Sequence, residues 1–258
     1  MLKKITPLIL TFNEEANIER TLKPLYWASE VLVVDSGSDD RTLEIISKFP
    51  NARVVTRKFD SHAKQWNFGL HQCRISTEWV LALDADYVLT EQFIQELVVL
   101  VPNDHVGGYQ ASFRYCIGGK MLRGSLYPPV TVLYRHEGAS YIQDGHTQRV
   151  SLNHKTETIS GCILHDDRKP FDRWLSAQFK YARLELAHLL QTPFLKLQWP
   201  DRLRHFYVLM PFLTIIYCLF IKRGIFDGKA GIIYAMQRSI AEAVLALVML
   251  KHRLGFLK

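Results

Sequence analysis

Residues 79–86 read WVLALDAD, and this stretch sets the expected fold of the chain. Trp79–Leu83 is apolar at every position, which is typical of a strand buried on both faces of a parallel sheet. The run ends directly at Asp84 and Asp86, and open α/β sheets bind their ligands at the carboxyl ends of strands. Two carboxylates suit a divalent cation, which prefers oxygen ligands and bridges readily to phosphates. The octapeptide therefore predicts an α/β sheet with a candidate metal and phosphate site at one edge.

Two earlier stretches repeat the pattern of an apolar strand followed by a polar turn. We expect strands over Ile5–Thr11 and Val31–Val34. Asn13 is placed to cap a helix with apolar residues at helical spacing, and Ser36–Asp39 turns the chain into the next helix. The other expected elements are a strand over Arg53–Thr56, a helix over His62–Gln72 and a helix capped by Thr90. This alternation predicts a mainly parallel sheet flanked by helices.

The pattern changes after residue 104. Strands and turns follow one another, with strands expected over 109–117, 130–135 and 148–152 and a break at Gly118-Gly119. From residue 171 the chain reads as helical, because Phe171–Gln191 places its apolar residues on one stripe. We therefore expect a domain over residues 1–170, with halves 1–104 and 105–170, and a helical region over residues 171–258.

Three motifs stand directly after expected strands: Thr11–Glu15 (TFNEE), Val33–Thr42 (VVDSGSDDRT) and Leu83–Asp86 (LDAD). In order and spacing they resemble the large inverting family two of the GT-A glycosyltransferases. The resemblance implies a Rossmann-like GT-A fold, transfer of a sugar from a nucleotide diphosphate sugar, and a divalent metal, Mn²⁺ or Mg²⁺. It makes residues 1–104 the nucleotide-sugar-binding half and residues 105–170 the acceptor-side half.

The resemblance also implies roles for single residues. Asp35 would contact the nucleotide base or ribose, Asp84 the ribose or the metal, and Asp86 would be the principal metal ligand. His62–Gly69 stands where such enzymes carry a helix that faces the nucleotide, and Lys64 and Asn67 share one face of that helix. The residues expected to bind the nucleotide sugar are Thr11, Asn13, Glu14, Asp35, Ser36, Lys64, Asn67 and Asp84.

His165 ends a short apolar run in the later part of the domain. Many GT-A enzymes complete the metal shell with a histidine there, and neutral imidazole is a competent ligand. We therefore expect His165 to join Asp84 and Asp86 at the metal. Asp166 and Asp167 most simply begin the helix that follows.

The general base is the part of the site that the sequence leaves open. Residues 119–128 (GKMLRGSLYP) resemble, more loosely, a segment of a subgroup that extends lipopolysaccharide cores and related surface glycans. Two carboxylates common in that subgroup are absent, since this chain has Tyr127-Pro128-Pro129 and Gly145-His146-Thr147-Gln148 at those places. Inverting transfer needs a group that takes the proton of the acceptor hydroxyl. Asp144 is the nearest acid and our candidate base, with His146 orienting the substrate; a structural Asp-Gly turn is the alternative.

Positive charge is concentrated in the C-terminal region. The whole chain has a net charge of +7, but residues 1–170 carry 19 Lys and Arg against 20 Asp and Glu, whereas residues 171–258 carry 13 against 5. This region also holds the apolar runs Phe206–Ile221 and Ile232–Leu250. The first has 16 residues, fewer than the about 20 that usually span a bilayer, and the second is interrupted by Glu242. The combination favours helices that lie on anionic lipid.

These observations predict a glycosyltransferase attached peripherally or monotopically to the cytoplasmic face of the inner membrane, acting on a lipid-linked or cell-surface glycan. The alternative uses of the C-terminal region are a helical homo-oligomer (dimer) interface, packing over the catalytic domain, and a re-entrant pair of helices. No nucleic-acid motif is present, and the four cysteines form no Cys-x-x-Cys pair, which fits a reducing compartment. The rival functions are a catalytically weak nucleotide-sugar-binding scaffold and a nucleotidyltransferase. The second is disfavoured because Asn13-Glu14-Glu15 replaces the expected basic, glycine-rich loop.

Overall fold

A computed structural model describes residues 1–144, 147–207 and 209–256; of residues 143, 144 and 147 it describes the backbone alone. The chain forms two units. The first comprises residues 1–119 and 127–168, and the second comprises residues 120–126 and 169–258.

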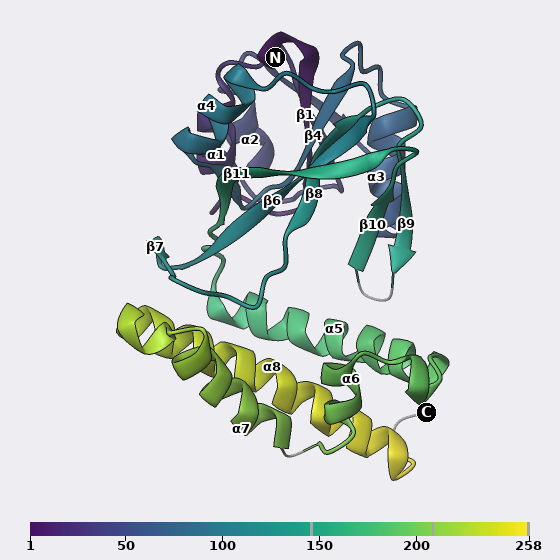
Figure 1. Ribbon diagram of the computed structural model, residues 1–258, viewed down its shortest axis with the longest axis vertical. Coiled ribbons are helices and arrows are strands. Elements are labelled where there is room, and N and C mark those ends of the chain that lie inside the picture. Colours follow the sequence, from purple (N-terminus) through teal and green to yellow (C-terminus); the bar gives the residue numbers. More distant parts are fainter. Residues whose placement is uncertain (145–146, 208, 257–258) are drawn as a thin grey trace. The chain divides into compact units, whose positions relative to one another are not determined.

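The first unit is built on a sheet with the strand order β3-β2-β1-β4-β8-β6-β11-β5 (Figure 1). Its strands are β1 (Ile5–Thr11), β2 (Val31–Asp35), β3 (Ala52–Thr56), β4 (Trp79–Asp84), β5 (Tyr87–Leu89), β6 (Val106–Ile117), β8 (Val130–Arg135) and β11 (Lys155–His165). β1 is parallel to β2 and β4, β2 is parallel to β3, and β6 is parallel to β11. β9 (Ser140–Asp144) and β10 (Thr147–Ser151) pair as a separate antiparallel hairpin.

Helices cover both faces of this sheet. They are η1 (Leu2–Lys4), α1 (Ile18–Leu22), η2 (Lys23–Leu25), α2 (Thr42–Ile46), α3 (His62–His71) and α4 (Glu91–Val99). α1, α2 and α4 bury Ile18, Ile46 and Phe93 in one core, against Ile9 of β1. α3 buries Trp66 against the opposite face, in a second core that contains Leu8 of the same strand. Alternate residues of one strand thus enter different cores, which is the arrangement expected of a sheet buried on both sides.

The predicted α/β fold, a mainly parallel sheet flanked by helices, is confirmed. Two local predictions were wrong. Asn13 does not cap α1, whose N-cap position is Asn17; instead Asn13 adopts a positive φ of 55° in the loop after β1. Asp166 and Asp167 do not begin the next helix either, because its N-cap position is Pro170. Strands β5, β9 and β11 had no matching prediction, because β5 has only three residues and the other two carry polar residues among their apolar ones.

The second unit is helical. Its elements are β7 (Lys120–Met121), α5 (Phe171–Gln191), η3 (Phe194–Lys196), α6 (Trp199–Arg204), α7 (Leu209–Ile216), the π-helical turn η4 (Tyr217–Ile221), η5 (Gly224–Asp227) and α8 (Lys229–Arg253). α8 packs against both α5 and α7, and its core with α5 contains Ala182, Leu245 and Val248. Within the described residues, α8 is the one helix long and apolar enough to cross a membrane by length and composition, which is weak evidence alone.

Candidate active site at the carboxyl edge of the sheet

The predicted site residues come from strands whose carboxyl ends lie at one edge of the sheet. β8 runs antiparallel to both β4 and β6, so β6 points the same way as β4, and β11 is parallel to β6. The ends of β1, β2, β4 and β11 therefore carry Thr11, Asp35, Asp84 and His165 to the same edge. This is where open α/β sheets bind their ligands.

The loops after β1 and β2 are joined by hydrogen bonds. The backbone N–H of Asn13 donates to Ser38 Oγ at 2.8 Å, and its side chain exchanges two bonds with Asp39, at 2.6 Å to the carboxylate and 2.9 Å from the backbone N–H. The N–H of Glu14 donates to Thr42 Oγ1 at 2.7 Å. Because these bonds fix both loops against each other, the first two motifs of the sequence form a single rigid rim.

Asp35 organises the second of these loops. Its carboxylate is fully buried and accepts bonds from the N–H groups of Gly37 and Ser38, at 2.8 and 2.9 Å, and from Ser38 Oγ at 2.5 Å. The neighbouring Ser36 Oγ accepts from Gln65 Nε2 of α3 at 3.0 Å, and the Ser36 N–H donates to the carbonyl of Thr11 at 2.9 Å. The structure thus shows Asp35 holding the loop, and its predicted contact with a nucleotide stays a prediction.

Lys64 and Asn67, both on α3, make different contacts. Lys64 is largely exposed and lies 3.4 Å from Asp60, so its ammonium group reaches solvent. Asn67 binds the backbone of Tyr141 in β9 twice, donating to its carbonyl at 2.8 Å and accepting from its N–H at 2.7 Å. Trp66 stacks on the Tyr141 ring, with 5.2 Å between ring centroids. Asn67 therefore fastens β9 to α3, whereas Lys64 is paired with Asp60 at the surface, and its predicted contact with the donor stays a prediction.

Asp86 and His165 lie side by side. β5 pairs with β11 so that Tyr87 stands opposite His165, which brings Asp86 Oδ2 within 3.2 Å of His165 Nε2. Burial disfavours the charged imidazole, but the nearby carboxylates of Asp86 and Asp84 outweigh it and raise the pKa of His165. Nδ1 of His165 is buried without a hydrogen-bond partner among the described residues, so one ring nitrogen remains for a ligand.

Of the predicted metal ligands, the structure pairs Asp86 with His165. In the described part of the chain, no group of three or more His, Cys, Asp and Glu side chains is placed to hold a metal ion. Asp84 ends β4, and Ala85 and Asp86 form the turn that leads into β5, which pairs with β11. The expectation that Asp84, Asp86 and His165 share one metal ion stays a prediction.

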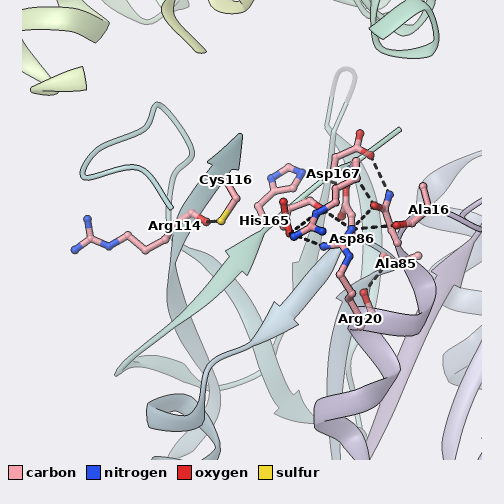
Figure 2. Close-up of polar contacts among 12 residues, drawn as sticks. Ala16, Arg20, Ala85, Asp86, Arg114, Cys116, His165 and Asp167 are labelled. Atoms are coloured by element: carbon pink, nitrogen blue, oxygen red, sulfur yellow. Dashed lines mark hydrogen bonds and ion pairs between the residues drawn. The ribbon is translucent and has the colours of Figure 1, made fainter. Parts of the chain in front are cut away.

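Asp166 joins the Asp86–His165 pair to Arg20 of α1. Figure 2 shows Arg20, Asp86, His165 and Asp167 close together. The N–H of Asp166 donates to the carbonyl of Asp86 at 3.0 Å, and its buried carboxylate accepts from Arg20 Nη1 at 2.5 Å. Oδ2 of Asp166 also accepts from Arg168, at 3.0 Å from Nε and 2.8 Å from Nη2. Burial lowers the pKa of Arg20, although Asp166 acts in the opposite direction. Two cations thus share one carboxylate beside Asp86.

Asn17 is the second centre of the network. It is 1% exposed, and Nδ2 donates to Glu14 at 2.8 Å and to Asp167 at 2.9 Å. Oδ1 accepts from Arg20 Nη2 at 2.7 Å and from the N–H of Arg168 at 2.9 Å. Asn17, Arg20 and Arg168 were not among the predicted site residues. The charged run Asp166-Asp167-Arg168 after the strand is a signal that could have pointed to Arg168, whereas Asn17 and Arg20 have no such signal in the sequence.

Aromatic rings surround His165. The rings of Tyr87, Tyr115 and Tyr127 meet its imidazole edge to face, at centroid distances of 5.3, 4.8 and 4.9 Å. The hydroxyl groups of Tyr87 and Tyr127 are hydrogen-bonded to each other, and burial raises the pKa of both. Tyr127 belongs to the first unit and to the segment 119–128 that resembles the surface-glycan subgroup, and its ring lies against His165.

The predicted base lies at the limit of the described structure. Asp144 ends β9 and its backbone pairs with that of Thr147, but its side chain and the whole of His146 lie outside the described residues. Their predicted roles therefore stay predictions.

Comparison with known proteins shows the family of the chain. The sequence profile described as glycosyl transferase family 2 matches residues 8–183, more than half of the chain and all of the site described above. The chain belongs to glycosyl transferase family 2. The predicted family and enzyme class, a glycosyltransferase, are confirmed at this level.

Two curated relatives of this family 2 member are informative. The lipopolysaccharide core biosynthesis glycosyltransferase LpsC of Rhizobium meliloti is 31% identical over 121 residues, or 44% of each chain. An uncharacterized glycosyltransferase of Rickettsia bellii is 34% identical over 110 residues, which is 42% of this chain and 36% of the relative. The matches thus span less than half the length of these relatives.

A solved structure shows the fold of the family 2 member independently. S. aureus TarS 1-349, in complex with UDP-GlcNAc, superposes with a TM-score of 0.50 at 16% identity, covering 98% of this chain and 92% of that one. At this identity the likeness shows the fold alone. The predicted GT-A architecture is therefore supported by both sequence and structure.

Proposed function

We propose that this chain transfers a sugar from a nucleoside diphosphate sugar to a hydroxyl group of a lipid-linked or surface glycan, with inversion at the anomeric carbon. The observation that carries the proposal is the Asp86–His165 pair, 3.2 Å apart, at the edge where the loops after β1 and β2 interlock. The names of two relatives support the substrates: LpsC acts in lipopolysaccharide core biosynthesis, and TarS was solved with UDP-GlcNAc.

Asp86 and His165 suit a divalent metal. A carboxylate oxygen and an imidazole nitrogen both ligate Mn²⁺, and Asp86 Oδ2 and His165 Nε2 face each other at 3.2 Å. When bound, the metal would neutralise charge on the diphosphate. Asp84, two residues before Asp86, would contact the ribose or the metal.

Residues of the chain itself would bind the donor and accept the proton. The joined loops around Asn13 and Asp35 would hold the nucleoside, and the exposed Lys64 would face an anionic group of the donor. Asp144 would take the proton from the acceptor hydroxyl as its oxygen attacks the anomeric carbon, while the sugar–phosphate bond breaks on the opposite side. Fixing donor and acceptor in line makes the displacement effectively unimolecular, which is a large part of the rate enhancement.

Calorimetric titration with UDP, GDP and ADP, each with Mn²⁺, Mg²⁺ or a chelator, tests this function. We expect metal-dependent binding of one diphosphate, and transfer activity with a sugar donor of that base. Asp86→Asn should abolish both while the circular dichroism spectrum stays unchanged. Asp104→Asn, at a fully exposed aspartate, is the matched control and should bind like the wild type. No binding of any diphosphate by the wild type would favour the scaffold alternative.

We also propose that the second unit attaches the protein to the membrane. Ile232, Met236 and Leu247 lie on α8 with 47%, 55% and 53% of their surface exposed. Glu242 of the same helix is instead buried, and its carboxylate accepts from Arg204 at 2.9 Å. The helix therefore buries its acid and leaves these three apolar side chains exposed. An exposed apolar face on a basic unit suits anionic lipid, and the relationship to LpsC is consistent with a membrane-bound acceptor.

Sedimentation with vesicles of phosphatidylethanolamine and phosphatidylglycerol tests the attachment. Burial of an aliphatic side chain is worth about 1.5–3 kcal/mol, so the triple variant Ile232→Gln/Met236→Gln/Leu247→Gln should bind vesicles at least about tenfold more weakly. The control is Val99→Gln/Val101→Gln, which removes two of the more exposed apolar side chains of the first unit and should bind like the wild type. Equal binding by the triple variant would place the attachment elsewhere.

A further inference from the structure

Arg238 lies on the packed face of α8. Gly231, Tyr234 and Arg238 are three and four residues apart, so they share one face of this helix. The carbonyl oxygen of Gly224 in η5 fills the space that a Cβ atom at Gly231 would need. The Tyr234 hydroxyl accepts a hydrogen bond from the N–H of Leu126 at 2.8 Å. This face of α8 therefore packs against other parts of the second unit, and Arg238 stands about one turn beyond Tyr234 on it.

One nitrogen of the Arg238 guanidinium group has no acceptor. Nε is buried and without a hydrogen-bond partner among the described residues, although the residue as a whole is partly exposed. Glu242 stands four residues further on, the spacing at which a helix pairs opposite charges. Its two carboxylate oxygens accept from Arg204 instead, at 2.9 and 3.2 Å. A buried donor without an acceptor costs free energy, so an anion bound at Arg238 would stabilise this part of the unit.

A second cation, Lys222, lies close to Arg238. Lys222 directly follows η4, and η4, η5 and α8 all pack against one another. The carbonyl oxygen of Cys218 in η4 stands 2.8 Å from the Cβ position of Gly224 in η5. Burial raises the pKa of the Cys218 thiol, and the charges of Arg238 and Lys222 act in the opposite direction. Both cations therefore lie near one buried sulfur atom.

Positive charge exceeds negative charge in the second unit as a whole. The unit carries 16 Lys and Arg against 5 Asp and Glu. Asp227 is buried and lies 3.4 Å from Arg123 Nε, and Asp172 is in the first turn of α5. The other three acids share the cation of Arg204; they are Glu185, Asp201 and Glu242. The excess remains when every acid of the unit is counted, so the unit attracts anions.

Exposed apolar side chains flank Lys222. Phe220 and Ile221 precede it with 59% and 65% of their surface exposed. Ile225 and Phe226 follow it with 48% and 67% exposed. A free phosphate leaves these side chains in water, whereas a lipid covers them with acyl chains while its phosphate meets the cations. The surface therefore fits a phospholipid better than a soluble anion.

We propose that Lys222 and Arg238 bind the phosphate group of an anionic phospholipid at the membrane surface. The inference rests on the proposed membrane attachment, to which it adds a specific headgroup site beside the apolar face of α8. The Arg238 guanidinium group donates to phosphate oxygens in a fixed fork, and its buried Nε gains the acceptor that it lacks. Lys222 supplies a second positive charge to the same headgroup.

Thermal unfolding with soluble short-chain lipids tests the site without a membrane. Dihexanoylphosphatidylglycerol below its micelle concentration should raise the Tm of the wild type, whereas dihexanoylphosphatidylcholine, which has no net charge, should leave it unchanged. The shift should vanish in Arg238→Gln and in Lys222→Gln. Arg74→Gln, at an exposed arginine of the first unit, removes the same charge and should keep the shift. No shift in the wild type would overturn the inference, and an equal shift with inorganic phosphate would overturn the choice of a lipid.

Vesicle sedimentation separates the headgroup site from the apolar attachment. Lys222→Gln/Arg238→Gln should bind vesicles of phosphatidylglycerol and phosphatidylcholine about tenfold more weakly, and vesicles of phosphatidylcholine alone like the wild type. Its Tm without lipid should not fall, because the change removes a cation that has no partner for its buried nitrogen. Equal weakening on both vesicle types would mean that the two cations only support the fold. If the wild type binds no vesicle at all, the proposed attachment fails, and the short-chain lipids still decide the headgroup site.

Discussion

Replacing Asn17 with alanine should destabilise the first unit strongly, although the change removes only one small polar side chain. The side chain is 1% exposed and makes four hydrogen bonds, with Glu14, Asp167, Arg20 and the N–H of Arg168. Alanine leaves all four partners without this buried amide. A hydrogen bond to a charged group contributes about 1.5–3 kcal/mol, and losses within one network are not additive.

We therefore expect the free energy of unfolding to fall by about 3 kcal/mol, the value of one or two independent charged bonds. For a unit of this size, 1 kcal/mol corresponds to a shift in Tm of roughly 2–4 °C, which predicts a Tm lower by roughly 6–12 °C. Thermal unfolding followed by circular dichroism measures the shift.

The control is Asn153→Ala, because Asn153 is exposed and a surface substitution usually changes stability by less than about 0.5 kcal/mol. A shift for Asn17→Ala no larger than that of the control would refute the reasoning, since it would mean that the network contributes no net stability. In that case Asn17 would matter through the position of Asp167 and Arg168 alone, and donor binding would be the quantity to measure.

Two further predictions concern single side chains elsewhere. Arg204→Ala should lower the unfolding free energy of the second unit by about 3–5 kcal/mol, because it leaves the carboxylates of Glu185 and Glu242 buried without their cation. Chemical denaturation would measure the loss, and a loss below about 1 kcal/mol would contradict the prediction. Asn67→Ala should expose the backbone N–H of Tyr141 to faster hydrogen exchange, while the exchange of β1 stays as in the wild type; unchanged exchange at Tyr141 would show that β9 does not depend on Asn67.

The sequence by itself determined the parallel half of the sheet and its edge. β1 begins and ends where expected, and β2 and β4 differ from the expected strands by one residue. These strands are buried on both faces, so each is an unbroken apolar run that ends at a polar turn, and that pattern is local. The three motifs follow those ends, which is why the family could be identified from the motifs before the fold was known.

The tertiary structure alone decided which polar groups meet. Asp86 and His165 are 79 positions apart and are joined by the pairing of β5 with β11, while Arg20 and Asp166 are 146 apart. The hydrophobic periodicity of a single segment cannot predict such a contact, because the contact depends on which strands pair in the whole sheet. The same holds for Glu242, which interrupts an apolar run in the sequence but lies buried against Arg204, 38 residues earlier. Local hydrophobic pattern fixes where strands end, and long-range packing fixes which charges share a site.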